Sequence, residues 1–175
     1  MYFSNFPYIA YDNKGDGELK IVTNILKRLA LRTEIINEQA IFDLYDVPNG
    51  DTPETVAADV YGDPELHWIV LYANNITDRY HDWPMNTTQF LSFVEDKYTN
   101  PNAVHHYEIT QQSGDTKITI NIGTDNTDHP SATAITNYEY EDDLQNQKSR
   151  IRLINPTYVV SIISEFEKRM KEGNV

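Results

Sequence analysis

The sequence predicts an α+β fold in which short helices and short strands alternate before a C-terminal amphipathic helix. Helix start signals stand directly before apolar stripes of helical period, and other stretches rich in strand formers are bounded by turns. With 175 residues, 39% of them hydrophobic, the chain is long enough to bury a modest core. We expect four segments: an N-terminal aromatic arm with a short helix (1–40), a core with the helix that follows it (41–100), a β-rich acidic segment (101–154) and a C-terminal helix (155–175).

Aromatic side chains crowd the start of the chain. Five of the first eleven residues are aromatic, namely Tyr2, Phe3, Phe6, Tyr8 and Tyr11. These rings need burial, so we expect them either to pack on the protein's own core or to dock on a neighbouring protein. After a glycine-containing turn, an apolar stripe of helical period predicts a short helix over residues 23–31. Its members are Val22, Ile25, Leu26 and Leu29.

The clearest local signals lie between residues 41 and 73. Residues 41–47 are rich in strand formers and run into a Pro-Asn-Gly turn. Thr52 is placed to cap a helix with a proline in its first position, and Gly62 to end that helix in the left-handed conformation. A second helix then starts at once. Its cap and first position are Asp63 and Pro64, and its buried stripe is Leu66, Ile69, Val70 and Ala73.

The second half of the chain predicts one more helix, several strands and a final helix. Asn86 or Thr87 caps a helix that reaches residue 97, and residues 105–109 and 117–122 form a hairpin. A further strand is expected over 151–154 and a polar loop over 123–131. The last helix has Asn155 as cap, Pro156 in the first position and one apolar stripe. That stripe is Val159, Ile162, Ile163, Phe166 and Met170.

Charge and composition exclude several classes of protein. There are 27 acidic and 14 basic residues, and the formal net charge of -13 predicts no nucleic-acid partner and no anionic membrane. Cysteine is absent, which excludes disulfides, thiol nucleophiles and cysteine zinc sites. The longest apolar run, residues 68–73, is far shorter than a membrane span, and no basic region precedes an apolar stretch at the start. We therefore expect a soluble protein that is not exported.

Catalytic and cofactor motifs are missing from the sequence. It contains no nucleophile elbow, phosphate loop, dinucleotide fingerprint or metalloprotease helix, so we expect no enzyme, no catalytic residues and no cofactor. The best metal candidates are His105 with His106 and the loop of Asp125, Asp128 and His129. Adjacent histidines in a strand point to opposite faces, and the loop lacks the ligands of a calcium site, so we expect no metal.

Two loops of the predicted core carry a resemblance to the LysM βααβ module. This module consists of a strand, a Gly-Asp-Thr turn, two short helices and a second strand, and residues 47–75 match the turn and both helices. In LysM modules the loops before and after the helices hold sugar. The resemblance thus implies an alternative function as a module that binds peptidoglycan or chitooligosaccharides. Its sugar-binding residues would be Gly50, Asp51, Thr52, Asn74 and Asn75.

A longer run is similar to the baseplate wedge protein 53 family of contractile-tailed bacteriophages, in which a LysM-like core lies inside a longer chain. The run includes Tyr61-Gly62-Asp63-Pro64-Glu65-Leu66-His67-Trp68 and ends at Asp82-Trp83-Pro84. The resemblance implies a noncatalytic structural subunit of the virion tail baseplate, assembled in the host cytoplasm. It also implies several copies in a ring, which clamp neighbouring wedge proteins around the hub and contact hub-proximal tail proteins. The stretch 110–137 matches this family least.

The resemblance to the wedge family implies that the aromatic arm and the basic edge of the C-terminal segment bind neighbouring proteins. The expected partner-binding residues are Tyr2, Phe3, Phe6, Arg150, Arg152, Phe166, Arg169 and Met170. The LysM-type sugar module stays open as the alternative function. A third alternative, a cell-wall hydrolase, would need two carboxylates in one cleft, and no spacing in the chain argues for such a pair.

Overall fold

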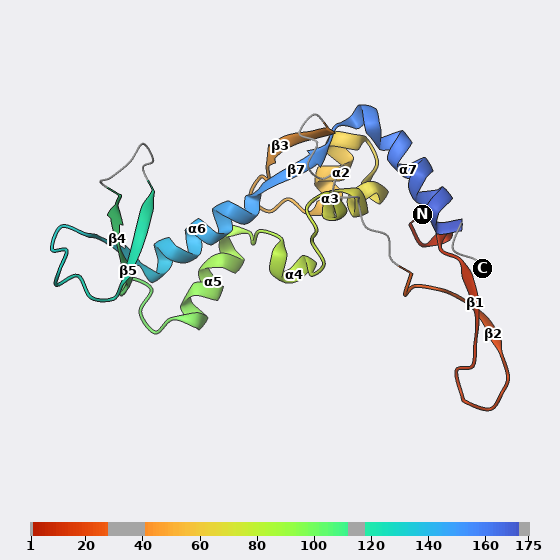
Figure 1. The fold of residues 1–175 in the computed structure, drawn as a ribbon, viewed down its shortest axis with the longest axis horizontal. Coiled ribbons are helices and arrows are strands. Elements are labelled where there is room, and N and C mark those ends of the chain that lie inside the picture. Colours follow the sequence, from red (N-terminus) through yellow and green to blue (C-terminus); the bar gives the residue numbers. More distant parts are fainter. Residues whose placement is uncertain (1, 28–40, 112–117, 172–175) are drawn as a thin grey trace. The chain divides into compact units, whose positions relative to one another are not determined.

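A computed structural model of the chain describes residues 2–27, 41–111 and 118–171 (Figure 1). Both helices and strands occur in these residues, which confirms the α+β class. Residue contacts divide the chain into two units. Unit 1 contains Met1–Val47, Asp51–Asp82 and Arg150–Val175, and unit 2 contains Pro48–Gly50 and Trp83–Ser149. Most of unit 2 is therefore inserted into the sequence of unit 1.

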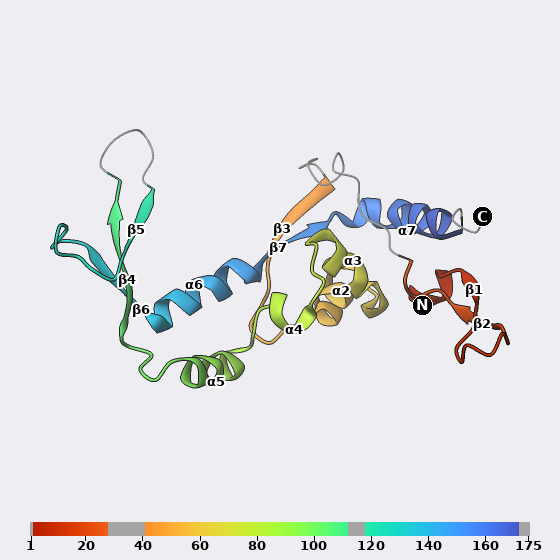
Figure 2. The same ribbon diagram turned by 60° about the horizontal axis from the view of Figure 1, so that its bottom comes forward.

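The centre of unit 1 is a two-stranded antiparallel sheet packed on two helices. Strand β3 (Phe42–Asp46) pairs with β7 (Arg150–Ile154), with Phe42 opposite Ile154. Helix α2 (Pro53–Tyr61) and helix α3 (His67–Ala73) lie beside this pair in both ribbon views (Figures 1 and 2). The predicted strands over 41–47 and 151–154 and both helices are confirmed, and the arrangement in space is β-α-α-β. The second strand of this arrangement follows the insertion.

Local capping explains where the two helices of unit 1 begin and end. Thr52 and Thr55 form a capping box, in which the Thr52 N–H donates to Thr55 Oγ1 over 2.7 Å. Gly62 ends α2 with a φ of 76°, in the left-handed region that glycine tolerates. Asp63 Oδ1 then accepts from the Glu65 N–H over 2.8 Å, and the first turn is a 3₁₀ helix, η3 (Pro64–Leu66), that continues into α3.

Helix α7 (Pro156–Lys171) completes the core of unit 1. Asn155 caps it as predicted, because its Oδ1 accepts from the Thr157 N–H over 3.1 Å. Val159 packs in one buried cluster with Ile69, Ala73 and Ile154. Further along the same stripe Phe166 and Met170 are buried, while Ile162 and Ile163 are partly buried. The predicted apolar stripe therefore faces the protein's own core.

The N-terminal part of unit 1 is a short 3₁₀ helix followed by a hairpin. Helix η1 (Tyr2–Asn5) precedes β1 (Tyr8–Tyr11), which pairs antiparallel with β2 (Lys20–Thr23). The Asp12 carboxylate holds the turn by accepting from two glycine N–H groups. The predicted helix over 23–31 is wrong where the structure describes it, because residues 20–23 form a strand and a turn follows up to residue 27. Three consecutive β-branched residues, 21–23, favour the strand. Residues 28–31 lie outside the described residues.

Unit 2 contains two helices and a three-stranded antiparallel sheet. Helix α5 (Thr87–Lys97) has Asn86 as cap, as predicted. The sheet order is β5 (Thr119–Gly123), β4 (Val104–Thr110), β6 (Thr133–Thr136), which confirms the predicted pairing of the first two of these strands. Strand β6 and helix α6 (Asn137–Ser149) were not predicted. A short helix, α4 (Arg79–Asp82), ends the part of unit 1 that precedes the insertion. No helix in the described part of the chain could span a membrane.

Candidate functional site

Three of the expected partner-binding residues lie in the interior of unit 1. Phe6, Phe166 and Met170 form one buried cluster, and Met170 has no exposed surface. The Trp68 ring packs against this cluster with its centroid 4.6 Å from that of Phe166. For Phe6, the structure thus shows the first of the two alternatives, packing on the protein's own core. These side chains support the fold and present little surface to a partner.

The other expected partner-binding residues are more accessible. Phe3 is 60% exposed and its ring lies 5.3 Å from that of Phe6. Arg150 is exposed on β7, and the Arg152 guanidinium lies over the Phe42 ring at 5.0 Å. Arg169 is exposed on α7, where its Nε donates to Glu165 Oε1 over 2.7 Å. The side chain of Tyr2, the remaining residue of the set, lies outside the described part of the structure.

Lys27, which the sequence did not single out, joins the segment after the hairpin to the end of α7. Its Nζ donates to the carbonyl oxygen of Met170 over 2.6 Å and to that of Arg169 over 3.3 Å. The last carbonyls of a helix have no partners within the helix, and the C-terminal end attracts positive charge. A contact across more than a hundred residues of sequence carries no local sequence signal.

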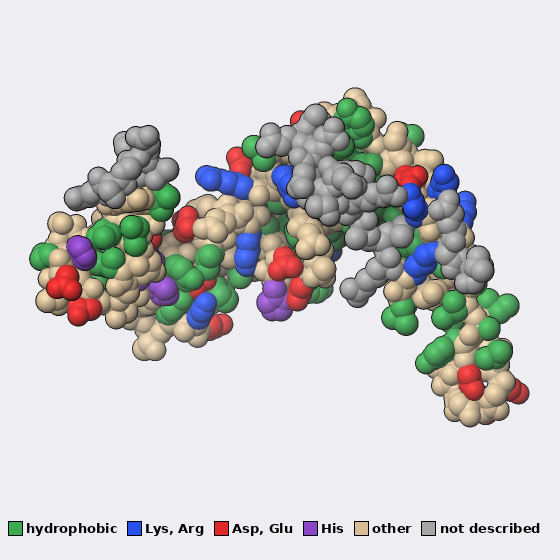
Figure 3. Space-filling view, in the orientation of Figure 1, with side chains coloured by type: hydrophobic (Ala, Val, Ile, Leu, Met, Phe, Trp, Pro, Cys, Tyr) green, Lys and Arg blue, Asp and Glu red, His purple; other side chains and the backbone are tan. Residues whose placement is uncertain are grey.

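Large apolar side chains cover the β1–β2 hairpin and are exposed to solvent. We call this set the hairpin surface; it consists of Tyr8, Tyr11, Leu19, Ile21, Ile25 and Leu26, each more than half exposed. The space-filling view shows hydrophobic side chains gathered over this hairpin (Figure 3). By the strand register, Tyr8 and Ile21 lie on one face of the hairpin and Tyr11 on the other. Large exposed apolar surface is typical of an interaction site. Among the described residues of unit 1, the hairpin surface is therefore our candidate contact region.

The LysM-like loops are engaged in contacts within the chain. The Asn74 side chain donates to the carbonyl oxygens of Val70 and Arg152 and accepts from the Arg152 N–H, each over 2.8 Å. These bonds fasten the end of α3 to β7. The Thr52 hydroxyl accepts from the Thr55 N–H over 3.3 Å and so serves the α2 cap. Gly50 and Asn75 both have positive φ, 87° and 54°. Asp51 lies just before the capping residue Thr52. Of the five expected sugar-binding residues, Asn74 makes the most hydrogen bonds within the described part of the chain.

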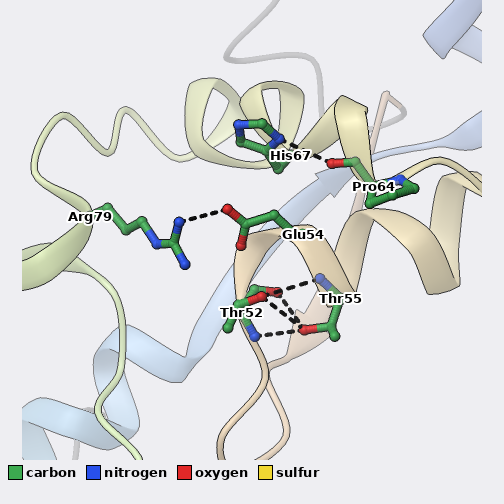
Figure 4. Close-up of polar contacts among 6 residues, drawn as sticks. All are labelled: Thr52, Glu54, Thr55, Pro64, His67 and Arg79. Atoms are coloured by element: carbon green, nitrogen blue, oxygen red, sulfur yellow. Dashed lines mark hydrogen bonds and ion pairs between the residues drawn. The ribbon is translucent and has the colours of Figure 1, made fainter.

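A carboxylate and an arginine meet at the start of α2 (Figure 4). Glu54 Oε1 accepts from Arg79 Nη1 over 2.6 Å, while Glu54 Oε2 is buried and accepts no hydrogen bond within the described residues. Burial alone would raise the pKa of Glu54, but the helix-start N–H and the Arg79 guanidinium outweigh it and lower the pKa. Glu54 is therefore an ionised structural carboxylate, unsuited to donate a proton at neutral pH.

Unit 2 buries another carboxylate beside two histidines. Glu141, 2% exposed, accepts from Lys97 Nζ and from the Tyr98 hydroxyl, each over 2.7 Å. The ring nitrogens Nδ1 of His105 and His106 lie 2.8 Å apart, so these adjacent side chains meet. The expectation that they point to opposite faces is wrong because the pairing of β4 with β6 shifts register between Val104 and His106. No group of three potential metal ligands is present in the described ranges.

A comparison with known protein families identifies the family of this chain. The family model described as base plate wedge protein 53 matches residues 1–116, which is about two thirds of the chain. The chain belongs to this family. It is thus a structural protein of the bacteriophage tail baseplate. The match covers β1 to α5 and β4 and ends within unit 2, so β7 and α7 lie beyond it. No curated protein sequence matches the chain.

Proposed function

We propose that this protein joins neighbouring wedge proteins of the baseplate through protein contacts and without catalysis. The partners would be other wedge proteins and hub-proximal tail proteins, bound by several copies in a ring that assembles in the host cytoplasm. The observation that carries the proposal is the hairpin surface, because a baseplate protein is surrounded by other proteins and this hairpin exposes large apolar side chains. Tyr2 and Phe3 also belong to the proposed contact, and Phe3 is 60% exposed.

Burial of the hairpin surface would stabilise both the hairpin and the assembly. A two-stranded hairpin is marginally stable by itself in water. Each square ångström of apolar surface removed from water contributes about 25 cal/mol, so several large side chains together supply enough free energy for a specific contact. Exposed apolar residues on both strands, such as Tyr8 and Ile21, would become interface residues on binding.

Positive charge at the end of α7 and along β7 forms the second part of the proposed contact. Arg150, Arg152 and Arg169 belong to these elements, and Lys168 and Lys171 stand beside Arg169 in the last turn of the helix. We call these residues the basic edge, in a chain of net charge -13. Charges at the rim of an interface act mainly on the association rate and on the choice of partner. We expect this edge to orient the protein on an acidic neighbour.

The test is recovery of wedge proteins by the tagged full-length chain, co-expressed with the tail genes. The double variant Ile21→Asp/Leu26→Asp places two carboxylates on the hairpin surface. We expect it to recover at least about tenfold less of the wedge proteins than the wild type, since charge in an interface core is strongly unfavourable. Substitution is preferable to deletion of α7, because α7 contributes Val159 and Met170 to the core.

The matched control is Tyr80→Asp, which changes a side chain that is 87% exposed on α4, elsewhere in unit 1. We expect this variant to recover wedge proteins as the wild type does. Circular dichroism shows whether each variant retains its helices. Normal recovery by a folded Ile21→Asp/Leu26→Asp variant would show that the hairpin surface is not the contact. Equal losses in the variant and the control would point to general destabilisation.

A further inference from the structure

Two adjacent histidines of β4 share a hydrogen bond in unit 2. The Nδ1 atoms of His105 and His106 lie 2.8 Å apart, and the two rings meet edge to face at 83°. The register shift between Val104 and His106 breaks the alternation of side chains that would keep the rings apart. At this distance one Nδ1 donates a proton and the other accepts it with its lone pair. The contact therefore holds one proton and has no room for a second.

Each ring of the pair has a further contact. His106 is 5% exposed, and its Nε2 lies 2.9 Å from Glu108 Oε1. The partly buried His105 ring stacks on the Tyr140 ring of α6, with the centroids 3.9 Å apart and the planes 10° apart. His106 meets the same tyrosine ring edge to face at 5.9 Å. His106 is thus held by a carboxylate of its own strand, whereas the stacked His105 ring joins β4 to α6.

The other charged groups near the pair come from α6 and the end of α5. Glu141 is close enough to His105 for their charges to interact, and it accepts hydrogen bonds from Lys97 and Tyr98. The remaining carboxylates of α6 accept hydrogen bonds from other residues: Glu139 from Thr136, Asp142 from Asn146 and Asp143 from Gln147. Strands β5 and β6 contain no titratable residue. Two carboxylates, Glu108 and Glu141, therefore favour positive charge on the histidine pair.

We infer that His105 and His106 form an acid-sensitive latch between β4 and α6. One added proton leaves the contact intact, because it binds to a ring nitrogen outside the contact. A second proton places an N–H group on each Nδ1, and two such groups share no hydrogen bond and repel as like charges. His106 keeps its bond to the Glu108 carboxylate, so the His105 ring leaves both the contact and Tyr140.

The latch opens as the pH falls. The separated rings hold one proton more than the joined rings, so acid favours separation and a return to neutral pH closes the latch. Histidines change charge between about pH 5 and 8, where carboxylates stay ionised, so the change begins at the histidines. The inference goes beyond the joining of wedge proteins. The latch lies in unit 2 and does not involve the hairpin surface, so either proposal can fail without the other.

The experiment follows the histidine ring signals of the isotope-labelled full-length chain by NMR, from about pH 8 to about pH 4.5, which includes the range where histidines change charge. At neutral pH the Tyr140 ring shields the carbon-bound protons of the stacked His105 ring, so we expect their signals to lie upfield. This upfield displacement should be lost in one acid step as the latch opens. His129, which is exposed in the loop after β5, is the internal reference and should titrate without such a loss.

Two variants separate the latch from simple stacking. His106→Phe keeps a buried ring but removes Nδ1, so a charged His105 meets no opposing N–H group and should stay on Tyr140 down to about pH 5. Glu108→Gln removes the carboxylate that favours charge on His106, so the acid step should move to lower pH by about 0.5–1. Its control, Glu95→Gln, removes an exposed carboxylate of α5 and should leave the step in place. Glu108→Gln decides the matter where His106→Phe is not folded.

Any of three results overturns the inference. One is an upfield displacement of His105 that persists in the wild type at about pH 5, the lower end of the histidine range, since the ring would then stay on Tyr140. Another is an acid step in His106→Phe at the same pH as in the wild type, which would assign the loss of stacking to His105 alone. The third is an unchanged step in Glu108→Gln, which would show that charge on His106 plays no part.

Discussion

The two sheets of unit 1 are built alike and covered differently. Strands β1 and β2 are close in sequence and expose Tyr8, Tyr11 and Ile21 to solvent. Strands β3 and β7 come from opposite sides of the insertion, and β7 buries Ile151, Leu153 and Ile154. The backbone pairing is antiparallel in both cases. Backbone pairing alone thus does not stabilise a sheet. The sheet is stabilised by burial of its side chains, either in the protein's own core or against a partner.

The largest effect is expected from matched isoleucine truncations in the two sheets. Ile154→Ala removes a side chain with no exposed surface and should lower the free energy of unfolding of unit 1 by about 2–5 kcal/mol. Ile21→Ala removes the same atoms from a side chain that is 80% exposed and should cost less than about 0.5 kcal/mol. Urea denaturation of both variants measures the difference. Similar costs at the two positions would show that the hairpin is packed in solution.

The link between α3 and β7 offers the next test. Asn74→Ala leaves the carbonyls of Val70 and Arg152 and the Arg152 N–H without these partners, so we expect a loss of about 2–3 kcal/mol. Asn75→Gly, one residue later, should be nearly neutral because the native φ of 54° suits glycine. Hydrogen exchange of the β7 amides reports the effect locally. Unchanged protection there in Asn74→Ala would contradict the role of Asn74 as a fastener.

Acid should act on the insertion and leave the β3–β7 sheet intact. Burial favours a higher pKa for Glu141, but the hydrogen bonds from Lys97 and Tyr98 prevail and lower its pKa below the usual 4.5. The folded state then holds fewer protons than the unfolded state. The stabilisation is complete above the unfolded pKa and is lost as the pH falls through the folded pKa.

We therefore expect unit 2 to lose amide protection below about pH 4 while β3 and β7 keep theirs. Glu141→Gln should cost about 1.5 kcal/mol at neutral pH and should remove most of this acid sensitivity. Glu95→Gln is the control at an exposed carboxylate. A variant Glu141→Gln with the acid profile of the wild type would assign the sensitivity to other groups.

The smallest effect concerns the tie between the hairpin segment and α7. Lys27→Met keeps the length of the side chain but removes the charge at the Met170 carbonyl, and should cost about 0.5–1 kcal/mol. It should also raise the exchange rate of the β1–β2 amides, since the segment after β2 loses its anchor. Lys14→Met, in the exposed turn of the hairpin, is the control. Equal exchange in both variants would show that Lys27 does not hold the hairpin.

Local rules of helix capping predicted much of this fold. Thr52, Asp63, Asn86 and Asn155 cap helices as their sequence context indicates, because the capping bonds span two or three residues. Helix α6 was missed because it is mostly polar and lacks an apolar stripe, and its buried residue is the carboxylate of Glu141. The pairing of β3 with β7 depends on residues on both sides of the insertion, and no local pattern encodes it.

The candidate sites were predicted less completely than the fold. The stripe with Phe166 and Met170 was recognised, but an apolar stripe has the same sequence pattern whether it faces the protein's own core or a partner. Phe6 also belongs to this cluster, and no local pattern encodes where the first residues of the chain fold back onto α7. The meeting of His105 and His106 depends on a register shift that strand periodicity does not encode.

The placement of β7 after the insertion sets an order for the growing polypeptide. On the ribosome, the long segment Trp83–Ser149 of unit 2 has been synthesised before the strand that pairs with β3 emerges. The insertion can therefore reach its native contacts while Ile69 and Ala73 still lack Ile154 and Val159, which complete their cluster. During that interval the nascent chain displays apolar surface of the kind that chaperones bind. Closure of this core therefore waits for the emergence of β7 and α7.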